Sequence, residues 1–128
     1  MYTPPAFRED DPVELRRLIR ETRLSTMVTA TPDGIMATPL PLVLDETEGE
    51  HGTLYGHLAK ANSQWSTPVV GDAMAIFDGP EAYVTPSWYA SKLEHGKVVP
   101  TWNYVAVHAY GTVEFFSDET RLYDAVSR

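Results

Sequence analysis

Residues 24–44 read LSTMVTA-TPDG-IMATPLPLVL, and this stretch decides the fold class. Polar and apolar residues alternate on both sides of TPDG at 31–34, a sequence typical of a hairpin turn. The pattern predicts one strand over 24–30 and a second over 35–44. Because the two prolines of the second strand cannot donate to a hydrogen-bond ladder, part of this strand is predicted to lie at a sheet edge or a bulge.

The rest of the chain predicts further strands and a helix towards each end. Strands are expected over 53–59, 72–77, 81–85 and 102–116, helices over 11–23 and from 118, a short helical turn over 61–66 and a long loop over 86–100. The first helix has Asp11 as its cap, Pro12 in its first turn and Glu14 at capping-box spacing. About six antiparallel strands in so short a chain predict a mainly β, α+β domain over residues 1–128, built as a barrel or a sandwich.

The composition predicts a soluble protein of a reducing compartment. The 128 residues include no cysteine, which excludes disulfides and thiolate chemistry. No apolar run approaches the ~20 residues of a membrane span, and MYTPP at 1–5 lacks the basic and apolar parts of a signal peptide. We therefore expect a cytoplasmic protein with no membrane partner. At the other end, the apolar stripe of Leu122, Ala125 and Val126 predicts a helix that continues past Arg128.

The formal net charge of −8 opposes binding to a nucleic-acid backbone. The candidate for a locally basic face is the first helix, which contains Arg16, Arg17, Arg20 and Arg23. These arginines alternate with glutamates, so a solvated helix face with internal ion pairs is the favoured interpretation.

Positive charge is scarce in the middle of the chain. From residue 24 to 120 the Lys and Arg residues are three lysines, against twelve Asp and Glu. Lys60 lies in GHLAKANSQW at 56–65, and the other two lie in PSWYASKLEHGKVVPTWNY at 86–104. The same two segments contain all three tryptophans. Cations beside flat aromatic side chains predict a site for an aromatic anion.

Each segment has two interpretations. Lys60 with His57, Asn62, Ser63 and Gln64 offers a cation and several donors for a phosphate, but a polar turn without a ligand fits the spacing equally well. The aromatic segment could wall a planar ring such as isoalloxazine. It could equally pack on itself or form a dimer interface, where Trp and Tyr are favoured.

Other chemistries find little support. His51, His57, His95 and His108 lack the spacing of metal ligands on one helix or strand, so no dedicated metal site is expected. The chain has neither a Gly-x-Ser-x-Gly elbow nor a Gly-rich phosphate loop. Neither nucleophilic catalysis by serine nor nucleotide hydrolysis is therefore predicted.

The chain resembles the FMN-binding negative transcriptional regulators of the PaiB type over nearly all of its length. The motifs shared with that family are MYTPPAF at 1–7, GHLAKAN at 56–62 followed by Gln64-Trp65, AYVTPSWY at 82–89 followed by Ser91-Lys92, and KVVPTWNY at 97–104. The resemblance implies a six-stranded antiparallel split β-barrel, similar to that of flavin reductases and pyridoxine-phosphate oxidases. It also implies a homodimer with its FMN held between the subunits.

By this resemblance, the FMN phosphate is expected near His57, Lys60, Asn62 and Gln64. The ring is expected against the second strand near Thr38 and Leu40, and the partner's segment 88–103 closes the pocket. The candidate cofactor-binding residues are Thr38, Leu40, His57, Lys60, Asn62, Gln64, Trp88, Tyr89, Lys92, Thr101, Trp102 and Asn103.

Three functions stay open at this point. The first is a flavin-binding regulator that represses transcription, with DNA as a partner that the resemblance implies and the net charge does not support. The second is a flavin-dependent oxidoreductase acting on a small molecule, which the implied fold permits without establishing. The third is a haem-binding split barrel, with His57, His95 or His108 as the iron ligand.

Overall fold

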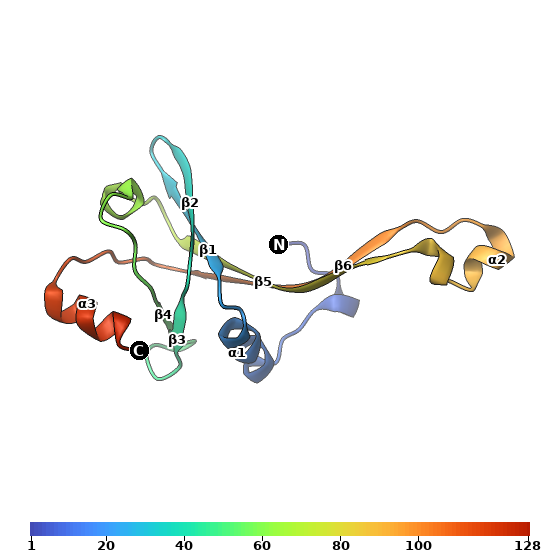
Figure 1. Ribbon diagram of the computed structural model, residues 1–128, viewed down its shortest axis with the longest axis horizontal. Coiled ribbons are helices and arrows are strands. Elements are labelled where there is room, and N and C mark those ends of the chain that lie inside the picture. The colour runs from blue at the N-terminus through green and yellow to red at the C-terminus, as the bar shows by residue number, and fades with distance from the viewer.

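The computed structural model describes the backbone of residues 1–128 and every side chain except those of Leu93 and His95. Six strands, three α-helices and three short 3-10 turns follow one another along the chain (Figure 1). Their bounds are η1 Pro5–Phe7, α1 Pro12–Glu21, β1 Ser25–Thr31, β2 Gly34–Leu40, β3 Val43–Asp45, β4 Thr53–Tyr55, η2 Ser63–Ser66, β5 Ala73–Val84, η3 Pro86–Trp88, α2 Ser91–His95, β6 Thr101–Gly111 and α3 Glu119–Val126.

The strands form two antiparallel sheets. Four strands pair in the order β2-β1-β5-β6, and β3 pairs with β4 in a separate two-stranded sheet. The predicted α+β class with antiparallel pairing is therefore confirmed. The hydrogen-bonded ladders of the described backbone do not join the two sheets into a closed barrel, because β2 and β6 end the larger sheet without further partners there.

The first hairpin forms as its sequence predicts, and β2 is an edge strand. Residues 35–44 do not form one strand, however. β2 ends at Leu40 and β3 begins at Val43. Pro41 follows Leu40 directly, and its lack of an N–H explains why the ladder stops there.

Other predicted boundaries also need correction. The strands expected over 72–77 and 81–85 are one strand, β5, with an irregular register between Asp78 and Glu81. Gly79 lies in this bulge, and a Cβ there would meet the Val105 carbonyl oxygen at 3.2 Å, so glycine allows the close approach. The strand expected to reach 116 ends at Gly111. The strand expected to reach 59 ends at Tyr55, and the turn over 61–66 is a 3-10 turn.

The hydrophobic core lies between α1 and one face of β5 and β6. Ile19 from α1 packs with Ala75, Phe77 and Val107, and Phe77 is only 1% exposed. The side chains that complete this core are Leu15, Leu18, Leu42, Leu44, Leu54 and Ala109. Asp11 caps α1 by accepting from the Val13 N–H at 2.9 Å, as the sequence predicts. This burial stabilises the body of the domain by about 1.5–3 kcal/mol for each large apolar side chain.

Beyond the core, β5 and β6 continue together as a two-stranded arm. From Phe77, β5 extends to Val84, which carries its end about 20 Å farther at about 3.3 Å per residue. The arm ends in η3 and α2, which form a tip at one end of the molecule's long axis (Figure 1). We use "arm" for residues 81–104. The arm extends beyond the core, so its side chains have few neighbours within the same chain.

Candidate functional site

A buried glutamine anchors the turn after β4 to the first hairpin. Gln64 is 1% exposed. Its amide nitrogen donates to Thr29 Oγ1 at 2.9 Å and lies 3.3 Å from the Met36 carbonyl oxygen. Its amide oxygen accepts from the Thr38 hydroxyl at 2.5 Å. These contacts join η2 to β1 and β2.

Asn62 extends the same network. Its side-chain oxygen accepts from the Gln64 backbone N–H at 2.9 Å and so caps η2. Its amide nitrogen donates to Thr38 Oγ1, also at 2.9 Å. Three candidate residues, Thr38, Asn62 and Gln64, are thus brought together across two elements that are distant in sequence. Each polar group in this network is hydrogen-bonded, as buried groups require.

The turn preceding η2 presents Lys60 to solvent. The Asn62 N–H donates to the Ala59 carbonyl oxygen at 2.8 Å, and the Trp65 indole N–H donates to the Lys60 carbonyl oxygen at 3.0 Å. The Lys60 and His57 side chains are both exposed. Among the described residues, the Lys60 ammonium has no carboxylate within ion-pair distance. A phosphate would find there an available cation on a backbone held at both ends.

Leu40 has a different environment from the other candidates on β2. Its side chain is 4% exposed, and its carbonyl oxygen accepts from Ser25 Oγ at 2.7 Å. A Cβ on Gly56 would lie 3.2 Å from Leu40 Cδ1, so the chain before the Lys60 turn passes close to this side chain. Leu40 therefore supports the turn from inside the domain.

The remaining candidates lie on the arm. Trp88, Tyr89 and Trp102 are exposed, with Trp88 74% accessible. Thr101 and Asn103, at the start of β6, are exposed as well. Lys92 donates to Ser87 Oγ at 3.2 Å, which links α2 to η3 within the tip.

The Trp102 ring has two neighbours on the arm. It lies opposite Tyr83 in the β5–β6 register, with ring centroids 5.9 Å apart. Its indole N–H donates to the Glu81 carboxylate. Large aromatic side chains gathered on an exposed two-stranded arm are typical of a surface that binds a partner.

The structure keeps the two groups of candidates apart within one chain. The green 3-10 turn η2 and the α2 tip lie towards opposite ends of the long axis in Figure 1. The arm alone carries its tip about 20 Å past the core. The candidate residues therefore form two separate groups, one at the turn over 57–64 with the neighbouring part of β2 and one on the arm.

The α1 arginines are engaged with carboxylates. Arg17 donates to Glu14 at 2.8 Å and pairs with Glu21, which raises the pKa of Arg17 above its ordinary value. Arg16 and Arg20 both pair with Glu46 in the loop after β3. The interpretation of this face as a set of ion pairs is confirmed, although two of the pairs reach beyond the helix.

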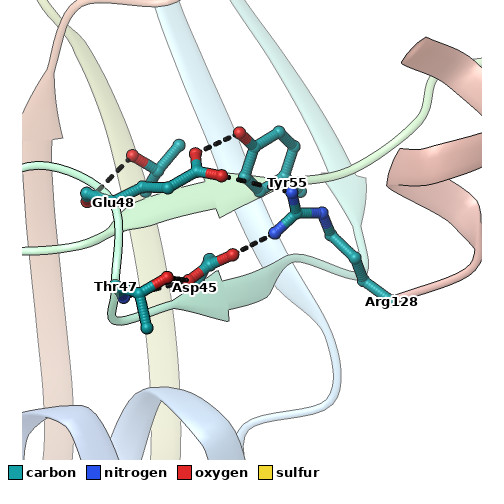
Figure 2. Close-up of polar contacts among 6 residues, drawn as sticks. Asp45, Thr47, Glu48, Tyr55 and Arg128 are labelled. Atoms are coloured by element: carbon teal, nitrogen blue, oxygen red, sulfur yellow. Dashed lines mark hydrogen bonds and ion pairs between the residues drawn. The ribbon is translucent and has the colours of Figure 1, made fainter.

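A polar cluster, shown in Figure 2, joins the end of the chain to the β3–β4 hairpin. Arg128 pairs with Asp45 and with Glu48, and its guanidinium lies 4.1 Å from the centroid of the Tyr55 ring. Hydrogen bonds from the Thr47 hydroxyl and N–H, followed by Arg128, hold the pKa of Asp45 below its ordinary value. The Tyr55 hydroxyl donates to Glu48, and this bond raises the pKa of Tyr55.

Sequence reasoning did not identify Thr29 and Ser25 as part of the site's support. Both are almost fully buried, at 1% and 2% exposure. The signal was present, because both fall at the same period-two positions of β1 as the buried Met27. A hydroxyl at a core position must find a hydrogen-bond partner, and Thr29 finds it in Gln64.

The histidines are dispersed in the structure. His108 is half-buried, on the strand face opposite the core, and its Nδ1 lies 3.5 Å from the Tyr110 hydroxyl. The side chain of His95, a candidate haem ligand, lies outside those described. Where side chains are described, no group of three His, Asp or Glu residues is placed to hold a metal ion. In the same part of the chain, every helix is too short or too polar to cross a bilayer.

Comparison with known proteins gives a consistent family match. The family model "Putative FMN-binding domain" matches residues 1–128. "Protease synthase and sporulation protein PAI 2" of Bacillus subtilis is 38% identical over 112 residues, covering 87% of this chain and 51% of that protein. An uncharacterized protein of Emericella nidulans is 33% identical over 145 residues, covering 92% of this chain and 58% of its own. An uncharacterized protein of Saccharomyces cerevisiae is 33% identical over 90 residues, covering 69% and 53%. This chain thus spans about half the length of these curated relatives.

Proposed function

Because the chain belongs to the FMN-binding domain family, as its motifs predict, we propose that it binds FMN at two equivalent sites between the subunits of a homodimer. Each site combines the 57–64 turn of one subunit with the arm of the other. We propose that the two sheets of each chain are the halves of the split barrel that the family resemblance implies.

The observation that supports this arrangement best is the separation of the two groups of candidate residues. An exposed cation lies on the fixed turn, and exposed aromatic side chains lie on an arm that points away from it. In a two-fold symmetric dimer each arm can reach the other subunit's turn. A single subunit offers the flavin only one side of its pocket.

The residues present fit FMN by their chemistry. Lys60 and His57 offer a cation and a donor for the phosphate, and the Ser63 hydroxyl is exposed beside them. Trp88, Tyr89 and Trp102 offer flat apolar surface for the isoalloxazine ring. Bound FMN would supply electron-transfer chemistry, and these residues would bind it, orient it and exclude water.

Direct binding of DNA through α1 finds no support in the structure. Arg16, Arg17 and Arg20 are committed to carboxylates, and the formal net charge is −8. We therefore propose flavin binding as the activity of this domain, and any effect on transcription as a consequence of that binding. An electrophoretic shift of DNA by the purified chain at physiological salt would contradict this assignment.

The proposal is tested by titrating the parent chain and Lys60→Ala with FMN and following flavin fluorescence. Loss of a charge-assisted hydrogen bond costs about 1.5–3 kcal/mol, so the Kd should rise about 10- to 100-fold. Arg23→Ala removes an exposed positive charge just after α1 and is the matched control, with an unchanged Kd. Equal FMN binding by Lys60→Ala and the parent would show that the phosphate is held elsewhere.

A further inference from the structure

We propose that Gln64 is a positioning residue for the flavin phosphate. Its side chain fixes the turn that presents Lys60 and does not touch the ligand. This inference rests on the proposed function, and it gives Gln64 a different role from the direct contact that the family resemblance implies.

The hydrogen-bonding capacity of the Gln64 amide is used inside the protein. Its nitrogen has two hydrogens, and three acceptors surround it: Thr29 Oγ1 at 2.9 Å and the carbonyl oxygens of Met36 and Met27 at 3.3 and 3.4 Å. Its oxygen accepts from Thr38. With 1% of its surface exposed, the residue has neither a spare donor nor a free face for a phosphate.

The turn depends on this anchor through a short chain of bonds. The Asn62 side-chain oxygen accepts from the Gln64 backbone N–H, and the Asn62 amide nitrogen donates to Thr38 Oγ1. Trp65 follows Gln64 in the chain, and its indole N–H donates to the Lys60 carbonyl oxygen. Among the described residues, no carboxylate forms an ion pair with the Lys60 ammonium that would fix its position. The backbone of the turn therefore sets the region in which the Lys60 ammonium can lie, and Gln64 anchors that backbone.

Gln64→Met tests this role because it keeps the length of the side chain and removes its hydrogen bonds. The Thr38 hydroxyl loses its acceptor, and the Thr29 hydroxyl and the Met36 carbonyl oxygen lose a donor. The turn then keeps the Asn62–Thr38 bond to β2 and loses the hydrogen bonds of the buried anchor. Affinity for the phosphate should fall, while affinity for the ring system, walled by the arm, should change little. Riboflavin has the same ring and no phosphate, so it separates these two contributions.

The measured quantity is the ratio of the riboflavin Kd to the FMN Kd. We expect Gln64→Met to lower this ratio about tenfold, the change that corresponds to one lost hydrogen bond to a charged group. Both ligands are titrated into the same preparation, so a fraction of unfolded protein affects both Kd values alike and cancels in the ratio. A general loss of structure would therefore leave the ratio unchanged.

Two further variants complete the test. Thr29→Val removes the closest acceptor of the Gln64 amide with little change in shape, and it should lower the ratio even if Gln64→Met does not fold. Thr22→Val removes a half-buried hydroxyl at the end of α1, which bonds the Leu18 carbonyl oxygen and not Gln64, and it should keep the parent's ratio.

The outcomes distinguish the two proposals. A parent that binds FMN no better than riboflavin overturns the proposed phosphate site, and the positioning role with it. A parent that prefers FMN, with Gln64→Met and Thr29→Val keeping that preference, overturns the positioning role alone. A lowered ratio in both variants, with Thr22→Val unchanged, supports it.

Discussion

Two variants that each lose flavin binding should restore it when they are combined in one dimer. Lys60→Ala damages the turn half-site and Trp102→Ala damages the arm half-site. In a heterodimer of the two, one site draws its turn from the Trp102→Ala subunit and its arm from the Lys60→Ala subunit, so both halves are native. The other site carries both substitutions.

The magnitude follows from the geometry. The arm carries its tip about 20 Å past the core, so its side chains cannot serve the turn of their own chain. Every site is then shared, and the heterodimer should bind about one FMN tightly where the parent dimer binds about two. If one chain supplied both halves, every site in the heterodimer would keep one substitution, and tight binding would not return.

The assay uses co-expression with two different affinity tags and purification over both columns. Light scattering verifies that the product is a dimer, and FMN titration gives the number of tight sites. Each variant purified alone is the control. A verified heterodimer that binds FMN no more tightly than either variant alone would refute the shared site, as would a parent chain that stays monomeric with FMN bound.

Three further predictions concern the fold. Phe77→Ala should lower the free energy of unfolding, measured by chemical denaturation, by about 3–5 kcal/mol, because it opens a cavity at the centre of the core. A loss under about 1 kcal/mol would show that this position is not central. Gly56→Ala should cost about 1–3 kcal/mol in the same assay, because its Cβ would lie 2.9 Å from the Pro41 carbonyl oxygen; an unchanged midpoint would argue against this close approach. Thr47→Ala should raise the pKa of Asp45 towards its ordinary value in a carboxyl NMR titration. A carboxyl pKa that is lower in the folded state stabilises the fold at pH values above the unfolded pKa. This contribution is lost as the pH falls through the folded-state pKa. The variant has less of it to lose, so its free energy of unfolding should fall less in acid than that of the parent. An unchanged pKa of Asp45 in Thr47→Ala would show that the Thr47 hydroxyl does not lower it.

The sequence predicted the parts of the fold that depend on local chemistry. The cap at Asp11, the hairpin turn at 31–34 and the edge position of β2 are all confirmed. Each follows from backbone donors and acceptors that are close together in the chain. Strand ends were harder to predict, because residues 78–80 were expected to separate two strands, while in the structure they lie in an irregular part of one strand.

The sequence named candidate residues but could not give their arrangement in space. The family resemblance made Thr38, Asn62 and Gln64 candidates together, and the structure brings them into one network. Which of them face a ligand depends on the side-chain contacts of β1, whose buried Thr29 was not singled out. The position of the arm could not be read from periodicity, because alternation gives the faces of a strand and not the direction in which a hairpin leaves the core.

The arm also links the folding of this domain to its concentration. Its aromatic side chains are exposed in one chain, so in the proposed dimer their burial contributes to stability only after two chains associate. Dilution should therefore lower the melting temperature, and added FMN should raise it by favouring the associated form. In the proposed dimer, a newly synthesised chain exposes the arm until it associates with a second chain. Until then the arm is an open hairpin with hydrophobic side chains, to which another unpaired strand could add.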